Sequence, residues 1–344
     1  MVTGFRRLLI ISLWVALLMA ILYTPNCSFD KKSINIFTWG DLLEPAVIAD
    51  FEKKTGIKVH LNYYSSNEEL MVKMKATEGR GYDLIIPTDY AVRSLVKEGL
   101  LQKIEKSKIS SWQDINPILL EQSYDPQNNY SIPFVYEIYA LGINNNDFSS
   151  FTPSWKMIFD PKVVNYKISM LNDPLDCVAI ASLYLFGPVS SLTESQVGTV
   201  KNLLLTQKKW VEAYADTRGD YFLATKNCSV VLASSSYLQK SIRKFPFISM
   251  VVPQEGTFIT IENLCIPKLS EKKEATYAFI NHITKAESAL HHYQSFGFFP
   301  AVKHPEIDKE TDKFLKDKFR KYHSLQNIMP QKELRELWLE IKTE

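Results

Sequence analysis

The chain has 344 residues, of which 46% are hydrophobic and 12% aromatic, and its formal charge is +2 at pH 7. This length and composition suffice for two domains with buried cores. The nearly balanced charge argues against a basic surface of the kind that binds nucleic acid, so no nucleic-acid partner is expected.

The first 27 residues have the layout of an export signal. Arg6 and Arg7 precede an apolar run from Leu8 to Tyr23, and a polar segment follows. A basic segment before a short apolar one is typical of secretory signals. The run is shorter than the roughly 20 residues that span a bilayer comfortably. We therefore expect residues 1–27 to direct export to the periplasm, with an uncleaved anchor or a lipid attached to Cys27 as alternatives.

Strands and helices alternate from Ser33 onward. Apolar runs and alternating patterns predict strands at 34–37, 57–61 and 83–86. Apolar residues at helical spacing predict helices at 44–54, from Asn67 onward, and at 90–98. This order of elements is typical of a doubly wound α/β domain.

The alternation continues well beyond the usual size of one domain. A long strand is predicted from Ser131 to Asn144, and the β/α pattern restarts after it, with strands at 166–171, 228–233 and 247–252 and helices at 176–186, 195–209 and 331–342. Phe258 to Ile266 is a second long extended segment. Two α/β units joined by extended crossovers predict two lobes that close over a cleft about a hinge.

The predicted first lobe comprises residues 33–135 with about 263–303, and the second comprises 136–262 with about 304–344. Three cysteines lie in these lobes, namely Cys177, Cys228 and Cys265, and an odd number cannot pair completely. Each has apolar neighbours, so we expect buried free thiols. A Cys177–Cys228 disulfide is the alternative for an exported protein.

The sequence contains none of the common motifs for nucleotide binding or for a nucleophilic serine. The run Ser234-Ser235-Ser236 suits a helix N-cap better than a nucleophile. The adjacent His291 and His292 would point apart on a helix, which disfavours a shared metal site. We therefore expect no catalytic role, no bound metal and no cofactor.

Asp173 and Asp176 allow two interpretations. Asp173 precedes Pro174 and Asp176 would lie in the first turn of a helix, which favours capping. Paired acids also occur in glycosidases, so a hydrolase using this pair is an alternative. A third interpretation is that the pair faces a positively charged ligand.

Aromatic and acidic side chains recur where predicted strands end or cross between the lobes. They are Trp39, Asp41, Tyr90, Tyr136, Glu137, Tyr139, Asp173, Asp176 and Glu262. Open α/β sheets bind ligands at the carboxyl ends of their strands, so we expect these residues to converge on one cleft. Carboxylates pair with ammonium groups and aromatic faces attract them. The predicted ligand is an organic cation.

Several segments occur together in a characteristic order: Trp39-Gly40-Asp41, Phe51 to Val59, Ser66-Asn67-Glu68, Tyr82 to Tyr90, Lys97-Glu98-Gly99 and Tyr130 to Pro133. In this combination the chain resembles the periplasmic polyamine-binding proteins of ABC importers, which bind spermidine or putrescine. The resemblance runs from about Ile34 to the C-terminus. It implies an α/β solute-binding fold with the ligand between two lobes and delivery of that ligand to an inner-membrane ABC permease.

The resemblance also implies roles for individual residues. Trp39 and Tyr90 become ring walls around the ligand. Asp41, Asp173, Asp176 and Glu262 become acids that face its amines, and Asp173 and Asp176 can cap a helix as well. Thr88 and Gln326 become polar contacts.

The chain departs from the family pattern at several positions. Aromatic residues of the family are replaced here by Leu42, Ala233 and Thr260, a tyrosine is replaced by Phe298, and Glu137 stands where a small residue is usual. Fewer rings predict weaker and less length-selective amine binding, unless Tyr136 and Tyr139 supply ring surface. A ferric-ion or other small-solute binder of the same fold is the alternative.

Overall fold

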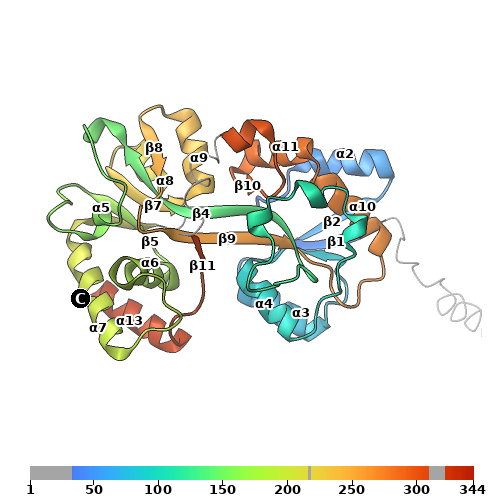
Figure 1. The fold of residues 1–344 in the computed structure, drawn as a ribbon, viewed down its shortest axis with the longest axis horizontal. Coiled ribbons are helices and arrows are strands. Elements are labelled where there is room, and N and C mark those ends of the chain that lie inside the picture. The colour runs from blue at the N-terminus through green and yellow to red at the C-terminus, as the bar shows by residue number, and fades with distance from the viewer. Residues whose placement is uncertain (1–32, 216–217, 310–321) are drawn as a thin grey trace, which may run out of the picture.

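The computed structural model describes residues 33–215, 218–309 and 322–344. These residues form two lobes that lie side by side along the longest axis (Figure 1). The predicted export signal at residues 1–27, including Cys27, lies outside the described residues. Among the described residues no helix is both long and apolar enough to cross a membrane.

The first lobe is built on a parallel sheet in the order β2-β1-β3. Its strands are β1 (Ser33–Thr38), β2 (Lys58–Tyr63) and β3 (Leu84–Ile85). Its helices are α2 (Pro45–Thr55), α3 (Asn67–Thr77), α4 (Asp89–Lys97), α10 (Lys273–Ile283) and α11 (Ala286–Phe296). Helices α3 and α4 lie on one side of the sheet, and α2 and α10 lie on the other (Figure 1).

Local sequence signals set the ends of these helices. Gly56 closes α2 in the left-handed region, with φ 72°, which a residue without Cβ adopts at no steric cost. The Ser66 hydroxyl caps α3 by accepting a hydrogen bond from the backbone N–H of Glu69 at 3.1 Å. Ser66 and Asn67, at this start of α3, lie on the side of the first lobe that faces the second lobe.

The second lobe contains a mixed sheet in the order β11-β9-β4-β7-β5-β6, with β8 and β10 also paired to β4. The strands are β4 (Ile132–Asn144), β5 (Ile168–Leu171), β6 (Val211–Ala215), β7 (Val230–Ser234), β8 (Ile248–Val251), β9 (Thr257–Leu264), β10 (Phe299–Pro300) and β11 (Tyr322–Ser324). Strand β5 is parallel to β6 and β7, whereas β4 is antiparallel to β7, β8 and β9.

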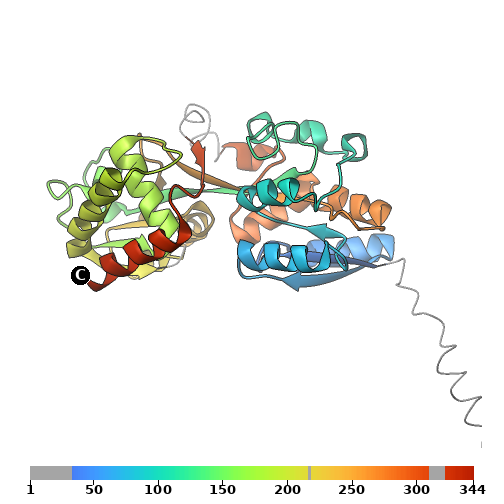
Figure 2. The same ribbon diagram turned by 90° about the horizontal axis from the view of Figure 1, so that it is seen from below.

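Helices cover both faces of this sheet. Helices α6 (Pro174–Phe186), α7 (Glu194–Gln207) and α13 (Gln331–Thr343) pack together on one side, as Figure 2 shows. Helices α8 (Asp220–Ala224) and α9 (Ser235–Lys244) lie on the other, and the short α5 (Lys156–Phe159) packs against α7. Five short 3-10 helices also occur among the described residues, at Lys106–Lys108, Trp112–Asp114, Pro117–Leu119, Asn145–Asp147 and Lys208–Trp210, and none of these residues lines the cleft described below.

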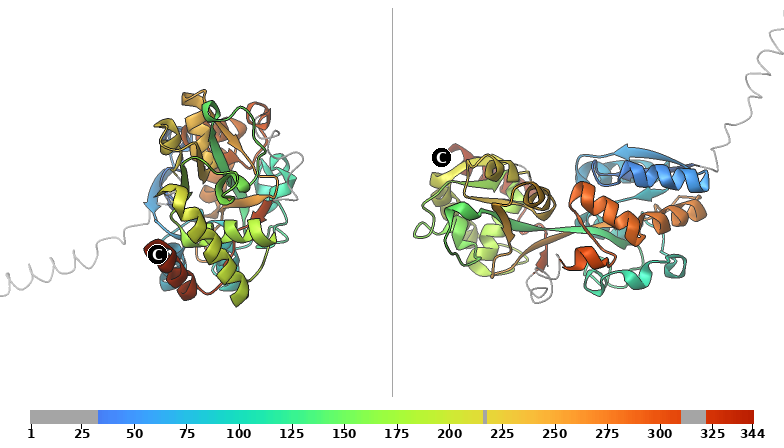
Figure 3. Two further views of the ribbon diagram at one scale, coloured as in Figure 1. Left: turned by 90° about the vertical axis from the view of Figure 1, so that its left-hand side faces the viewer. Right: turned by 90° about the horizontal axis from the view of Figure 1, so that it is seen from above.

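Strands β4 and β9 pass between the lobes as an antiparallel pair (Figures 1 and 3). The first half of β4 pairs with β9, and its second half pairs with β7. Beyond β9, Cys265 bridges to Ile85 of β3, which ties the crossover to the first sheet. This arrangement confirms the predicted two-lobed α/β fold with extended crossovers. The exact residue boundaries of the lobes stay a prediction.

The three cysteines of the lobes are buried free thiols, as expected. The alternative of a Cys177–Cys228 disulfide is wrong, because both are free; the Cys177 thiol instead donates to the backbone carbonyl of Leu171 at 3.0 Å. Cys177 lies in α6, whereas Cys228 precedes β7. Burial raises the pKa of the Cys177 thiol well above its usual range, which keeps it neutral.

Candidate ligand-binding cleft

A cleft of about 460 Å³ lies between the lobes, a size suited to a small molecule. Its walls come from the loop after β1, the starts of α3, α4, α6 and α9, the crossover strands, and the segment before α13. The lining residues are Trp39, Gly40, Leu42, Ser65, Ser66, Asn67, Glu68, Thr88, Asp89, Tyr90, Glu137, Tyr139, Asp173, Leu175, Asp176, Tyr237, Thr260, Glu262, Phe298, Leu325, Asn327 and Gln331.

The charge of this lining is one-sided. It carries six carboxylates, namely Glu68, Asp89, Glu137, Asp173, Asp176 and Glu262, and it includes no lysine, arginine or histidine among the described residues. Carboxylates gathered around one small volume repel one another and favour a cation between them. The cleft is therefore suited to a ligand with several positive charges.

The second-lobe end of the cleft is formed by Asp173 and Asp176. Asp173 is the N-cap of α6, and its Oδ1 accepts from the backbone N–H groups of Leu175 at 2.8 Å and Asp176 at 3.2 Å. The Asp176 carboxylate accepts from the Tyr139 hydroxyl at 2.8 Å. Burial, and then the charge of Asp173, raises the pKa of Asp176 to about 8. The pair thus caps the helix and faces the cleft at the same time.

The first-lobe end is formed by Trp39 and Glu262. The Trp39 indole N–H donates to Glu262 Oε2 at 3.0 Å, and the Trp39 ring packs against Tyr64 with 4.5 Å between ring centres. Burial, and then the charge of Glu137, holds the pKa of Glu262 well above its usual range. Glu262 is bridged through its backbone to Thr88. Thr88 lines the cleft, and its buried hydroxyl has no hydrogen-bond partner among the described residues.

Contacts across the cleft mouth join the lobes. Tyr90, at the start of α4, accepts a hydrogen bond from the Asn327 side chain at 3.3 Å. Asn327 also accepts from Gln331 at 2.7 Å, at the start of α13. Burial raises the pKa of the neighbouring Asp89 to about 7. The Asn327–Tyr90 hydrogen bond therefore joins the start of α4 to the segment before α13 at the rim of the cleft.

Residues 46–313 match the family model of bacterial extracellular solute-binding proteins. The chain belongs to this family. The match covers most of the chain and spans both lobes together with the crossovers. Membership agrees with the predicted export.

Individual relatives of this solute-binding protein have informative names. It is similar to the spermidine/putrescine-binding periplasmic protein of Escherichia coli K12, with 28% identity over 275 residues, 78% of this chain and 77% of the relative. It is also similar to the putrescine-binding periplasmic protein SpuD of Pseudomonas aeruginosa, with 28% identity over 276 residues and 75% of each chain.

The fold agrees with solved structures. The substrate-binding protein PotD of Streptococcus pneumoniae, from a spermidine/putrescine ABC transporter, superposes with a TM-score of 0.79 at 24% identity. The likeness covers 90% of this chain and 98% of that one. It shows the shared two-lobed architecture of the solute-binding proteins.

The structure places most of the predicted site residues in the wall of the cleft: Trp39, Thr88, Tyr90, Glu137, Asp173, Asp176 and Glu262. It does not bring Asp41, Tyr136 or Gln326 there. We therefore leave these three out of the proposed ligand-binding set.

The three residues that do not line the cleft have different surroundings. Tyr136 is only 2% exposed and packs against Phe299, because it points to the face of β4 opposite Glu137 and Tyr139. Asp41 is exposed in the turn after Trp39, with φ 53°, and its charge acts on Lys240 of α9. Gln326 lies between Leu325 and Asn327, which both line the cleft.

The departures from the family pattern concern the rings. Leu42, Thr260 and Phe298 line the cleft of this solute-binding protein, whereas Ala233 is fully buried and does not. Tyr139 lines the cleft and supplies ring surface there, and Tyr237 of α9 adds a ring that the sequence pattern does not predict. The signal for Tyr237 was its place in the first turn after Ser234-Ser235-Ser236. Asp89 also lines the cleft, as expected for the segment Thr88-Asp89-Tyr90 at the end of a strand, and Glu68 is a wall residue that the strand-end pattern did not indicate.

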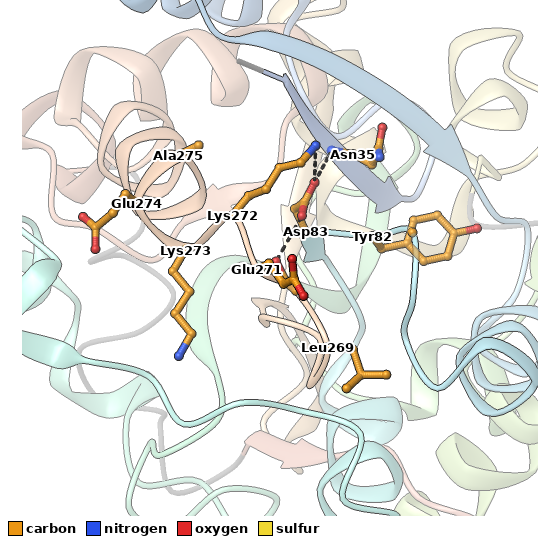
Figure 4. Close-up of a pocket in the computed structure, with 11 residues that line it drawn as sticks. Asn35, Tyr82, Asp83, Leu269, Glu271, Lys272, Lys273, Glu274 and Ala275 are labelled. Atoms are coloured by element: carbon orange, nitrogen blue, oxygen red, sulfur yellow. Dashed lines mark hydrogen bonds and ion pairs between the residues drawn. The ribbon is translucent and has the colours of Figure 1, made fainter. Parts of the chain in front are cut away.

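A second pocket, on the first lobe, lies at the other end of β1 and is larger, at about 830 Å³ (Figure 4). Its central acid, Asp83, is already satisfied: it accepts from the Asn35 backbone N–H at 2.9 Å and the Ser270 hydroxyl at 3.0 Å, and lies 3.6 Å from the Lys272 ammonium. Those contacts join β1 to the segment before α10. Asp83 therefore stabilises the lobe, and the smaller cleft remains the better site.

The two adjacent histidines do not share a site. His291 is exposed, whereas His292 is buried and its Nδ1 accepts from the Glu44 backbone N–H at 3.0 Å. Burial lowers the pKa of His292 to about 4, so it stays neutral. Within the described part of the chain, no three histidine, cysteine or acidic side chains are grouped so as to hold a metal ion.

Proposed function

We propose that this solute-binding protein binds a polyamine, such as spermidine or putrescine, in the periplasm and delivers it to an inner-membrane ABC permease. The observation that carries the proposal is the cleft lining, which has six carboxylates and no basic side chain among the described residues. A cation stabilises the ionised form of these acids, whereas a neutral or anionic solute brings no positive charge to pair with them.

The arrangement of rings supports a flexible cation in particular. Trp39, Tyr90, Tyr139 and Tyr237 line the same space as the acids. Aromatic faces attract ammonium groups and also cover methylene chains, so they suit a ligand whose charges are separated by hydrocarbon. The names of the relatives, which bind spermidine and putrescine, point to the same class.

The proposal includes no catalytic role and no cofactor. Asp173 is engaged with two backbone N–H groups, and Asp176 with Tyr139, so neither acid has the open position that a glycosidase pair needs around a sugar ring. We do not propose the ferric-ion alternative, because the described residues hold no group of ligands for a metal ion.

Thermal unfolding with a ligand panel tests the proposal. A ligand present at 100 times its Kd should raise the free energy of unfolding by about 2.7 kcal/mol. We expect spermidine or putrescine to raise the Tm, and sodium chloride at matched ionic strength to leave it unchanged. No shift with any polyamine, together with a shift produced by ferric citrate or a neutral sugar, would contradict the proposal.

A further inference from the structure

Glu137 occupies the middle of the cleft floor, between its two acidic ends. In the β4–β9 pair, Glu262 lies opposite Val135 and Thr260 lies opposite Glu137. Glu137 is therefore one two-residue step, about 6.7 Å, along the ribbon from Glu262. Tyr139, which holds Asp176, is one further step of the same length.

Electrostatic coupling agrees with this order. The charge of Glu137 contributes to the raised pKa of Glu262 at one end and of Asp176 at the other. Asp176 is not among the main causes of the raised pKa of Glu262, and Glu262 is not among the main causes of the raised pKa of Asp176. Glu137 thus lies close enough to both ends to act on each.

The Glu137 carboxylate is held in place by hydroxyl groups. The Ser234 hydroxyl donates to its Oε2, and the Ser236 hydroxyl donates to the same oxygen at 2.8 Å. Both serines belong to the start of α9, whose dipole favours a negative charge there. Within the described part of the chain, no ion pair joins Glu137 to a basic side chain; Lys240 lies over the Tyr237 ring instead, at 4.4 Å. The two hydroxyls orient the carboxylate. Burial, the largest effect, raises the pKa of Glu137, and the hydroxyls and the charge of nearby Lys240 lower it, so a cation in the cleft would add to a weak existing attraction.

We propose that Glu137 is a specificity-determining residue, which selects amines that carry a protonated nitrogen in the middle of the chain over diamines. This inference rests on the proposed function. A central ammonium would pair with Glu137 while the terminal ammonium groups pair with the two ends of the cleft. A diamine places methylene groups against Glu137, so the carboxylate keeps its two serine hydroxyls but gains no ammonium partner when it is buried under the ligand.

The selection therefore has an attractive and a repulsive part. It concerns the number of charged nitrogens and is separate from the length of the ligand. Spermidine and octamethylenediamine isolate this effect, because the two have equal chain length and differ only in whether the central position is a nitrogen or a carbon.

Titration calorimetry with these two amines tests the inference. The native protein should bind spermidine at least about tenfold more tightly than octamethylenediamine, the equivalent of about 1.4 kcal/mol. Glu137→Gln keeps the shape and an acceptor for the serines but removes the charge, so the ratio should fall to near one. Glu255→Gln is the matched control, because Glu255 also accepts from a serine hydroxyl, that of Ser154, outside the cleft. It should keep the native ratio.

The outcomes are separable. An unchanged ratio in folded Glu137→Gln, or equal binding of the two amines by the native protein, overturns the inference and leaves the proposed function standing. If the native protein binds neither amine, the proposed function fails and the inference fails with it. Should Glu137→Gln not fold, Glu137→Ala makes the same test with the small residue that the family usually has at this position.

Discussion

Neutralising either end of the cleft should weaken spermidine binding by roughly 2–5 kcal/mol, the range for removing one partner of a buried charge pair. The variants are Glu262→Gln and Asp176→Asn. Each new amide keeps an oxygen that accepts from the existing donor, Trp39 or Tyr139. The loss therefore reflects the missing charge opposite an ammonium group, and titration calorimetry measures it directly.

Asp173→Asn separates capping from charge in the same experiment. Asn caps helices about as well as Asp, so α6 should keep its stability while the affinity for spermidine falls. Asp173→Ala should instead also lower the free energy of unfolding, by about 1 kcal/mol. If Glu262→Gln and Asp176→Asn both fold and bind spermidine with native affinity, these residues are not part of the binding site.

Spermidine affinity should increase with pH between about 6 and 8. Burial and the charge of Asp173 raise the pKa of Asp176 to about 8, and burial raises the pKa of Asp89 to about 7, so part of the cleft is protonated at neutral pH without ligand. An ammonium group favours the ionised carboxylate, so binding releases protons. For one proton released, affinity changes by up to about tenfold per pH unit below the pKa. Calorimetry at several pH values measures this slope.

In the unliganded protein, the free energy of unfolding should fall as the pH rises, which is opposite to the trend of the affinity and provides a control. Asp176 holds a proton in the folded state up to pH about 8, whereas its ordinary pKa is 3.8, so the folded state binds more protons between these values. Its contribution to stability is fully present below pH 3.8 and is lost as the pH rises through about 8. Asp176→Asn should flatten both trends. Affinity for spermidine that is constant or falls from pH 6 to 8 would contradict this assignment.

The sequence pattern predicted the elements that have strong local signals. Helix α6 begins at an Asp-Pro cap, α3 at a serine cap, and α2 ends at Gly56, and each has an apolar face. Helices α10 and α11 were not predicted, and both lack a side-chain hydrogen bond at the N-cap, which is Lys272 or Lys285. Strand β6 was missed because it is short and partly exposed, so its apolar alternation is weak.

The sequence predicts which residues line the cleft where these residues follow the ends of strands. It does not predict them where the direction of a side chain on a strand decides whether it faces the cleft. Trp39, Thr88 and Asp173 follow strands, and the carboxyl ends of strands converge. On β4, however, alternation alone groups Glu137 with Tyr139 and sets Tyr136 apart, without saying which group faces the ligand. Pairing with β9 and the packing of Tyr136 on Phe299 decide it. These contacts are far apart in the sequence.

Two features of the cleft have different consequences for selectivity. Leu42 and Thr260 give less ring surface than the family pattern, which predicts weaker discrimination by ligand length. Glu137 adds an oriented charge, which discriminates by the number of protonated nitrogens. A binding site that tolerates different chain lengths but requires a central nitrogen would combine both features.

A crystal structure of the protein with spermidine would show whether the cleft between the lobes is the polyamine-binding site. The ligand should extend along the β4–β9 ribbon, with one terminal nitrogen at Glu262 and the other at Asp173 and Asp176, and Trp39 should lie against its chain. Spermidine bound on the outer surface of a lobe, with only water in the cleft, would contradict the account.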